Sequence, residues 1–356
     1  MSVIKQQYMN SSQLSELTKT VQQNCHIADA VHAGDYTLCV YLLKMREFYR
    51  WENGERFSVN LENKTVGSWL RQREALWDTL DNNEFHDIAL NNNSLSPFES
   101  ESINNKLIQH QLVYSGGMGV NNRPHFFLAE LELHEQHDEY SLYVAGKEYA
   151  RDMSAPPAMS HDNNIYIRKE SFRRLLWERL ETWRWNKPDN ALGRAFACYD
   201  CKDNLDDALV KMTETEIDNV IQHERGEIQA GDLLGNKWHE LLFSLPHSKS
   251  SIMLRAIRDH FADCLTTLPS LLRKNSSASW HFYFGNLNNM RKDLYPSLIK
   301  GYDEWYKTGS LTKMTEVIED GEKYWSNLCM QVLQIDQTDI KKQQIEIQNL
   351  IENNRL

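Results

Sequence analysis

One stretch in the second half of the chain, Thr213–Gly231, limits what this sequence can fold into. Its apolar residues recur every three or four positions, which is the period of an amphipathic helix. Glu224 falls in the middle of the apolar stripe, and His223 and Glu227 follow on one flank. A carboxylate on a buried helix face is costly unless it is paired, protonated or bound to a metal ion. The stretch therefore predicts a packed helix with ionisable groups on its buried side.

The ends of this helix are also predicted from the sequence. Thr213 and Glu216 have the spacing of a capping box, in which each side chain accepts a hydrogen bond from the backbone of the other. Gly231 is a residue type that commonly ends a helix. We therefore expect the helix to begin at Thr213, to end near Gly231, and to use Glu216 for structure and not for chemistry.

A second amphipathic helix is predicted over residues 251–267. It carries His260 and Asp263, which lie three positions apart and share the flank of its apolar stripe. We expect the two helices to pack as antiparallel neighbours with these polar flanks facing each other. That packing brings His223 and Glu227 of the first helix close to the pair on the second.

Inward-facing histidines and carboxylates on neighbouring helices are typical of bundles that bind two iron or manganese ions. Imidazole and carboxylate ligands suit iron, manganese or zinc. The usual Glu-x-x-His spacing is absent from both helices, and the zinc-protease motif H-E-x-x-H ends here in Glu instead of His. The alternative is a polar seam of His–carboxylate pairs that holds the helices in register. The candidate metal ligands are His223, Glu224, Glu227, His260 and Asp263, with Glu47 and His281 as further ligands.

Glu47 is a second carboxylate on an apolar helical stripe, in a helix predicted over residues 36–52. Two interpretations stay open for it: an internal salt bridge with Arg46 or Arg50, or direct participation in a site. In both cases we predict that Glu47 and Glu224 are buried.

The fold class predicted from these patterns is mainly α, with a small β-hairpin insertion in the N-terminal half. His125–His134 alternates between apolar and polar residues, and a second short strand follows the turn after it. Residues 147–153 are expected to form a helix. We predict an N-terminal helical region with the hairpin at 1–187, a C-terminal helical bundle at 188–335 and a polar end helix at 336–356.

Composition excludes several classes of protein. The chain has 39 basic and 50 acidic residues, and the resulting charge of −11 argues against general binding of nucleic acid or anionic membranes. No apolar run is long enough to span a bilayer, and the N-terminus lacks the apolar core of a signal peptide. Six cysteines are too few for a disulfide scaffold, and the lone C-x-x-C of Cys198 and Cys201 lacks the second pair of a zinc knuckle. We expect reduced, structural thiols in a cytoplasmic protein.

Several segments together resemble a family of bacterial proteins known by a placeholder name. They are AVHAGDYTLCVYLLKMREFYRWE, RPHFFLAELEL, VAGKEYARDMSAPPAM, IQHERGEIQAGDLLG, RDHFADCLTTLP and HFYFGNL. The resemblance covers most of the chain. It implies a bacterial, cytosolic origin and one composite architecture, and it assigns no catalytic residue.

The function expected from these observations is that of a metal-dependent helical protein of the non-haem iron or manganese carboxylate type, with oxidoreductase as its class. A non-catalytic helical binding or adaptor protein is the first alternative. A zinc-dependent hydrolase is the second, because histidine and glutamate also bind zinc beside a general base. The expected partner is an unidentified small molecule or protein, and the sequence leaves open whether the chain is an enzyme.

Overall fold

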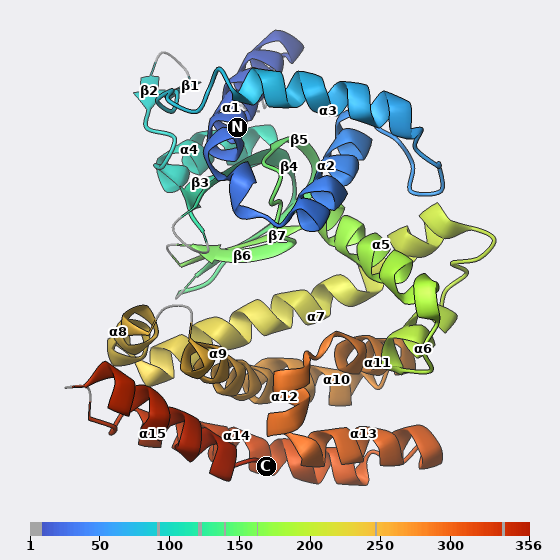
Figure 1. Cartoon of the computed structure of the whole chain (residues 1–356), viewed down its shortest axis with the longest axis vertical. Helices are drawn as coiled ribbons and strands as arrows, with labels where there is room; N and C mark the ends of the chain where they lie inside the picture. The colour runs from blue at the N-terminus through green and yellow to red at the C-terminus, as the bar shows by residue number, and fades with distance from the viewer. Residues whose placement is uncertain are drawn as a thin grey trace, which may run out of the picture. The chain divides into compact units, whose positions relative to one another are not determined.

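A computed structural model describes residues 9–90, 93–119, 123–138, 140–161, 163–245, 248–336 and 339–356. The protein is mainly helical, as predicted, and its chain divides into two compact units (Figure 1). The N-terminal unit comprises Met1–Arg179 and Lys202–Thr213, and the C-terminal unit comprises Leu180–Cys201 and Glu214–Leu356. Two helices contribute residues to both units: α5 (Lys169–Asn186) and α7 (Leu205–Leu234).

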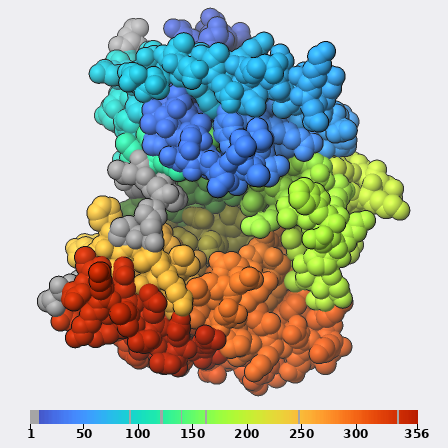
Figure 2. Space-filling view, in the orientation of Figure 1, coloured from blue at the N-terminus to red at the C-terminus, as the bar shows by residue number. Residues whose placement is uncertain are grey.

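The N-terminal unit surrounds a five-stranded sheet with helices. Its first helix begins with a capping box, in which Asn10 and Gln13 each accept from the backbone of the other. Figure 2 shows α2 and α3, the blue and light-blue segments, adjoining at the surface of this unit. Its other elements are α1 (Ser11–His32), α2 (Leu38–Glu52), α3 (Asn63–Trp77), the short strands β1 (Ile88–Leu90) and β2 (Asn93–Leu95), and α4 (Ser100–Leu107).

The sheet has the strand order β3-β4-β5-β7-β6. The pair β5–β7 is parallel and the other neighbouring pairs are antiparallel. The predicted hairpin is present as β4–β5, but the prediction of a small hairpin insertion was wrong about its size, because three further strands extend it. The strands are β3 (Leu112–Met118), β4 (Pro124–Gln136), β5 (Ser141–Arg151), β6 (Ala158–His161) and β7 (Asn164–Arg168).

The helix predicted over residues 147–153 is also corrected by the structure, because β5 continues to Arg151, which pairs with Phe127 of β4. The ladder between β4 and β5 contains register shifts, which break the strict alternation expected of a strand. Nearly every side chain of β5 is buried, so the strand lacks the polar face that alternation needs. Local periodicity therefore gave the wrong secondary structure here.

Both faces of the sheet are covered. On one face, Val21 and Cys25 of α1 belong to a core cluster with Phe126 and Leu128 of β4. On the other face, Phe127 packs in a separate cluster with Tyr143 and Tyr166 from β5 and β7. This two-sided burial fixes the position of β5, whose last residue, Arg151, lines the pocket described below.

The C-terminal unit is built of helices around a single apolar core that contains the fully buried side chains of Trp238, Trp280 and Trp325. The segment η4 (Asp263–Thr267) is π-helical and continues directly from α9. The other helices are α6 (Ala191–Ala197), α8 (Asn236–Ser244), α9 (Lys249–Ala262), α10 (Leu268–Lys274), α11 (Ser277–Asn286), α12 (Asn289–Leu294), α13 (Pro296–Thr308), α14 (Thr312–Val332) and α15 (Ile340–Asn353).

The central helix is longer than predicted at both ends. It begins at Leu205, so Thr213 lies inside it and its hydroxyl donates to the carbonyl of Leu209. The predicted capping box is therefore not formed. Glu216 is instead buried and accepts hydrogen bonds from Asn219 and two other side chains, those of Tyr199 and Ser279. Among the helices of the described residues, none combines the length and apolar character that crossing a bilayer requires.

Candidate functional site

The two helices that were predicted to pack through their polar flanks do so. His223 of α7 places its Nδ1 2.8 Å from Oδ1 of Asp263, the first residue of η4. Nearby, the hydroxyl of Thr266 donates to the carbonyl of Gln222 at 2.6 Å. The helices approach closely because Gly226 faces the backbone of the second helix, where a Cβ atom would collide with the Ala262 carbonyl. The predicted contact is confirmed for His223 with Asp263, whereas His260 contacts Arg291 and Trp325 and does not join it.

Asp263 is fully enclosed by partners. Its carboxylate accepts from Arg291 and from the hydroxyl of Tyr283, at 2.7 Å for the tyrosine, in addition to His223. Burial by itself raises the pKa of Asp263, but the charges of Arg291 and His223 outweigh burial and hold that pKa well below its usual range. Asp263 is therefore an ionised carboxylate whose charge is already balanced.

Glu227 contacts the second nitrogen of the His223 imidazole. It lies 3.3 Å from Nε2 of His223 and 2.9 Å from the guanidinium of Arg258. Burial works against its ionisation, yet these two partners lower the pKa of Glu227 to about 2. Burial also lowers the pKa of His223, but the two carboxylates raise it well above its usual value. The cluster is thus a chain of alternating charges.

The remaining candidates have separate environments. His260 donates from Nε2 to the Arg291 carbonyl at 2.9 Å and stacks on Trp325, and burial followed by the charge of Arg291 lowers its pKa well below the usual value. His281 lies 2.8 Å from the Tyr302 hydroxyl. Glu224 is half-buried, so the prediction of burial holds only in part for this residue.

This arrangement does not fit a bound metal ion. Metal ligands must offer free lone pairs, but those of Asp263 and Glu227 are directed at Arg291 and Arg258. Within the described ranges, no three His, Cys, Asp or Glu side chains are grouped so that they hold a metal ion. The prediction of iron or manganese therefore finds no support in this donor set, which has the form of the polar seam instead.

Glu47, the last candidate, belongs to the N-terminal unit and is 5% exposed, as predicted. Its Oε2 accepts from Nε of Arg50 at 3.1 Å, which is the internal salt bridge considered from the sequence. Burial raises the pKa of Glu47 against the opposing effect of Arg50. This pair forms part of the wall of a cavity within the N-terminal unit.

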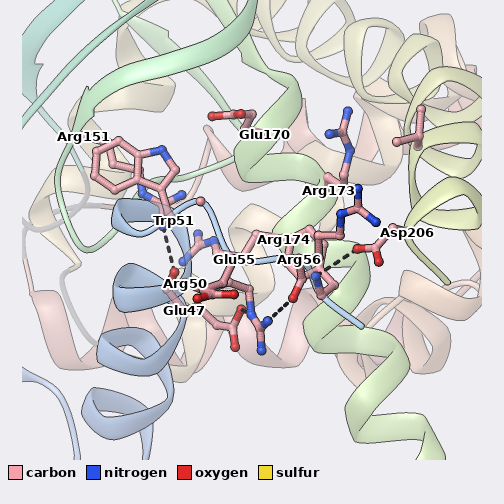
Figure 3. A pocket seen from close by; sticks show the side chains of 13 residues that line it. Glu47, Arg50, Trp51, Glu55, Arg56, Arg151, Glu170, Arg173, Arg174 and Asp206 are labelled. Carbon is pink, nitrogen blue, oxygen red and sulfur yellow. Dashed lines mark hydrogen bonds and ion pairs between the residues drawn. The ribbon is translucent and has the colours of Figure 1, made fainter. Parts of the chain in front are cut away.

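That cavity, which we call the arginine pocket, has a volume of about 250 Å3. Figure 3 shows its side chains converging from α2 and the turn after it, from the end of β5, and from the first turns of α5 and α7. Trp51, Phe57 and Val210 supply apolar lining. The charged lining consists of five arginines and four acids: Arg50, Arg56, Arg151, Arg173, Arg174, Glu47, Glu55, Glu170 and Asp206.

Several acids of the pocket are already occupied by protein donors. Asp206 accepts from the backbone N–H of Phe57 at 2.9 Å and from the Ser58 hydroxyl. Glu170 accepts from the backbone N–H of Glu148 at 2.8 Å, and burial is the main reason why its pKa is raised. The protein donors that hold these two acids are thus backbone N–H groups and a hydroxyl, not the arginines of the pocket.

Arg151 and Arg174 are buried, as is Arg50, and both keep an Nε without a hydrogen-bond acceptor among the described residues. Arg174 also makes an ion pair with Glu178 at 3.6 Å. The carboxylate nearest Arg151, that of Glu148, is 3.8 Å away and makes a closer ion pair with Arg168 at 2.8 Å. Burial, with repulsion from Arg174, lowers the pKa of Arg151 to about 10.

Sequence reasoning missed this pocket, although one signal was present. Arg173 and Arg174 are consecutive in the sequence, so on a helix they would place two cations side by side, about 100° apart. Arg151 gave no such signal, because a helix was predicted for residues 147–153.

The thiols match the prediction of structural cysteines. All six are free, and Cys198 is exposed while Cys201 is buried. Burial raises the pKa of both thiols, which keeps them in the unreactive protonated form.

Comparison with known proteins gives the family and no activity. Residues 16–168 match the N-terminal domain of a family of unknown function, DUF6866, and residues 173–354 match the C-terminal domain of the same family. Neither a curated protein nor a solved structure matches the chain. The two matches together span most of the sequence, which confirms the resemblance to a family with a placeholder name: the chain belongs to the DUF6866 family.

Proposed function

We propose that this protein is a small-molecule-binding protein whose N-terminal unit takes up an oxyanion in the arginine pocket. The observation that carries the proposal is the pair of buried guanidinium groups, Arg151 and Arg174, which line one cavity and each keep an Nε without an acceptor among the described residues. Carboxylate and phosphate groups are the natural partners of such arginines, because the planar guanidinium donates two parallel hydrogen bonds to their oxygens.

The electrostatics support an anion and not a cation. An arginine whose pKa is lowered to about 10 is a cation held in an unfavourable environment. A bound anion would remove part of that penalty, so the ligand would gain affinity from charge that the fold has already buried. Arg173, on the same turn of α5 as Arg174, is half-buried and its Nε also lacks an acceptor among the described residues, so it is available to reach the ligand.

The rest of the pocket limits the size and shape of the ligand. A cavity of about 250 Å3 is just below the roughly 300–1,000 Å3 of typical ligand sites, which suits a small metabolite and not a folded partner. Trp51 and Phe57 offer aromatic surface to an apolar portion of the ligand. The ligand class is therefore a compact molecule that joins a carboxylate or phosphate to a short apolar or flat body.

This proposal is the binding-protein alternative among the functions considered from the sequence, with the ligand class now specified. The metal-dependent oxidoreductase and the zinc hydrolase both need a set of free donors. The cluster around Asp263 directs its carboxylates at arginines, so it supports neither of them.

The test is thermal unfolding of the full chain in inorganic phosphate, in succinate and in sodium chloride at matched ionic strength. A ligand present at 100 times its Kd stabilises the folded state by about 2.7 kcal/mol, which shifts the unfolding midpoint by several degrees. We expect phosphate or succinate to raise the midpoint beyond chloride, and the larger of the two shifts identifies the anion type.

Two variants of the same helix locate the effect. Arg173→Gln removes one pocket cation and should reduce the shift, whereas Arg179→Gln changes an exposed arginine of α5 outside the pocket and should leave it intact. An equal response of the two variants, or no response beyond chloride in the unmodified chain, contradicts the proposal.

A further inference from the structure

A second cavity, of about 200 Å3, lies within the C-terminal unit beside the contact of His223 with Asp263. Most of its surface is formed by apolar atoms, and Val220, Phe282 and Leu287 contribute to it. The polar residues of its wall distinguish this cavity from an ordinary packing defect.

The helices that border this cavity are in antiparallel register. His223 contacts Asp263, so moving four residues back along α7 and four forward along the second helix brings Asn219 opposite Thr267. Both of these residues line the cavity, and they are 6% and 2% exposed. The register therefore predicts another polar pair across the seam at this level.

That pair is not made. Asn219 donates its amide to Glu216 at 2.6 Å, but its Oδ1 has no hydrogen-bond partner among the described residues, and neither has the hydroxyl of Thr267. A buried polar atom without a partner costs free energy. Oδ1 of Asn219 and the Thr267 hydroxyl are therefore available to hydrogen-bond a polar group of a ligand in this cavity.

The π-helical segment explains how this opening arises. In η4 the backbone N–H of Leu268 bonds to the carbonyl of Asp263, five residues earlier, so the turn is wider than an α-helical turn. Single π-helical turns inside α-helices are frequently found at functional sites. Here the segment begins at the residue that anchors the seam and ends at the residue with the unpartnered hydroxyl.

We propose that this cavity binds a small uncharged molecule with a hydroxyl or amide at one end and an apolar body. A ligand hydroxyl donates to Oδ1 of Asn219 and accepts from the hydroxyl of Thr267. The ligand is uncharged because the one carboxylate of the wall, Asp263, is already balanced by Arg291 and His223. The site does not depend on the arginine pocket, which belongs to the other unit.

Phenol and toluene are matched probes, since they share a ring and differ in the hydroxyl. Ligand-observed NMR titrations of the full chain should show phenol binding about five- to tenfold more tightly than toluene, as expected for one good hydrogen bond. Thr267→Val is nearly isosteric and should bring phenol down to the affinity of toluene. Because that hydroxyl has no partner among the described residues, the variant should unfold at the same temperature as the unmodified chain or higher.

Thr266→Val is the control, because its hydroxyl donates to Gln222 and does not line the cavity. It should lower the unfolding midpoint and keep the preference for phenol. Val220→Phe, which fills the cavity from a half-buried position, should abolish binding of both probes. Equal binding of phenol and toluene, binding of neither, or an undiminished preference in Thr267→Val overturns the proposal.

Discussion

Nδ1 of His223 lies 2.8 Å from Oδ1 of Asp263, and this contact ties the longest helix of the protein to the π-helical segment of the C-terminal unit. The pair sits between further charges of alternating sign, which makes the seam dependent on protonation and sensitive to the spacing of the two backbones. The first three predictions concern this seam.

The stability of the seam should depend on the charge of His223. The folded-state pKa of His223 is raised by its two carboxylate neighbours, so its stabilising effect is fully present below the unfolded-state pKa of about 6.5 and is lost as pH rises through the folded-state value. Asp263 stays ionised throughout, since its own pKa is lowered. His223→Gln should therefore cost about 1–3 kcal/mol near pH 6 and less near pH 9, measured by denaturant unfolding. A cost that is constant or that grows with pH would show that the imidazole is not charged in the fold.

Replacing His260 separates the seam from a metal site. His260→Ala removes a buried ring that packs on Trp325, so we expect a loss of about 2–4 kcal/mol in unfolding free energy. Elemental analysis should find no stoichiometric iron, manganese or zinc in the unmodified chain purified without a metal-binding tag. Stoichiometric metal that disappears in the alanine variant, with the fold retained, would restore the metal interpretation.

The close approach of the two helices should depend on Gly226. An added Cβ there would meet the backbone carbonyl of Ala262 and the Thr266 hydroxyl, so Gly226→Ala should destabilise the protein by about 1–3 kcal/mol. Gly231→Ala is the matched control on the same helix, because its Cβ would meet only Nε2 of His239, at an ordinary 3.8 Å. The control should be neutral or stabilising by up to about 1 kcal/mol, as alanine is the better helix former. Equal effects of the two substitutions would mean that the backbones are not in contact at Gly226.

The cysteines should be dispensable for binding. Both thiols of the C-x-x-C have raised pKa values, so neither is poised to react. The double variant Cys198→Ser, Cys201→Ser should bind the pocket anion as the unmodified chain does and lose no more than about 1 kcal/mol of stability, measured by calorimetry and unfolding. A change in anion affinity beyond about tenfold would assign these thiols a functional role.

The sequence was most informative where structure is local. The helical period of residues 213–231 and 251–267 predicted the faces that pack, and it placed His223 opposite Asp263 correctly. It did not show that Arg291, which lies on a different helix, would take the second oxygen of Asp263. A metal site and a salt-bridged seam require the same helical spacing of histidines and acids. Only the position of a cation in the folded protein distinguishes them.

The N-terminal unit was harder to predict because its sheet depends on non-local pairing. The first part of β5 was predicted correctly as the return strand of the hairpin. Its last residues, from 147 onward, were predicted as a helix, because β5 is buried on both faces and pairs with β4 through register shifts. The arginine pocket draws Arg50, Arg151 and Arg174 from distant parts of the chain. Such a site becomes visible only once the strands and helices are placed.

Calorimetric titration of the full chain with the anion that stabilises it, phosphate or succinate, tests the central claim most directly. The arginine pocket predicts one binding event per chain. Arg173→Gln should weaken it by about tenfold or more, the contribution of a hydrogen bond between charged groups, while Arg179→Gln should leave it unchanged. Identical binding heats and affinities in the two variants, or no saturable heat in the unmodified chain, would contradict the assignment of this pocket as an oxyanion site.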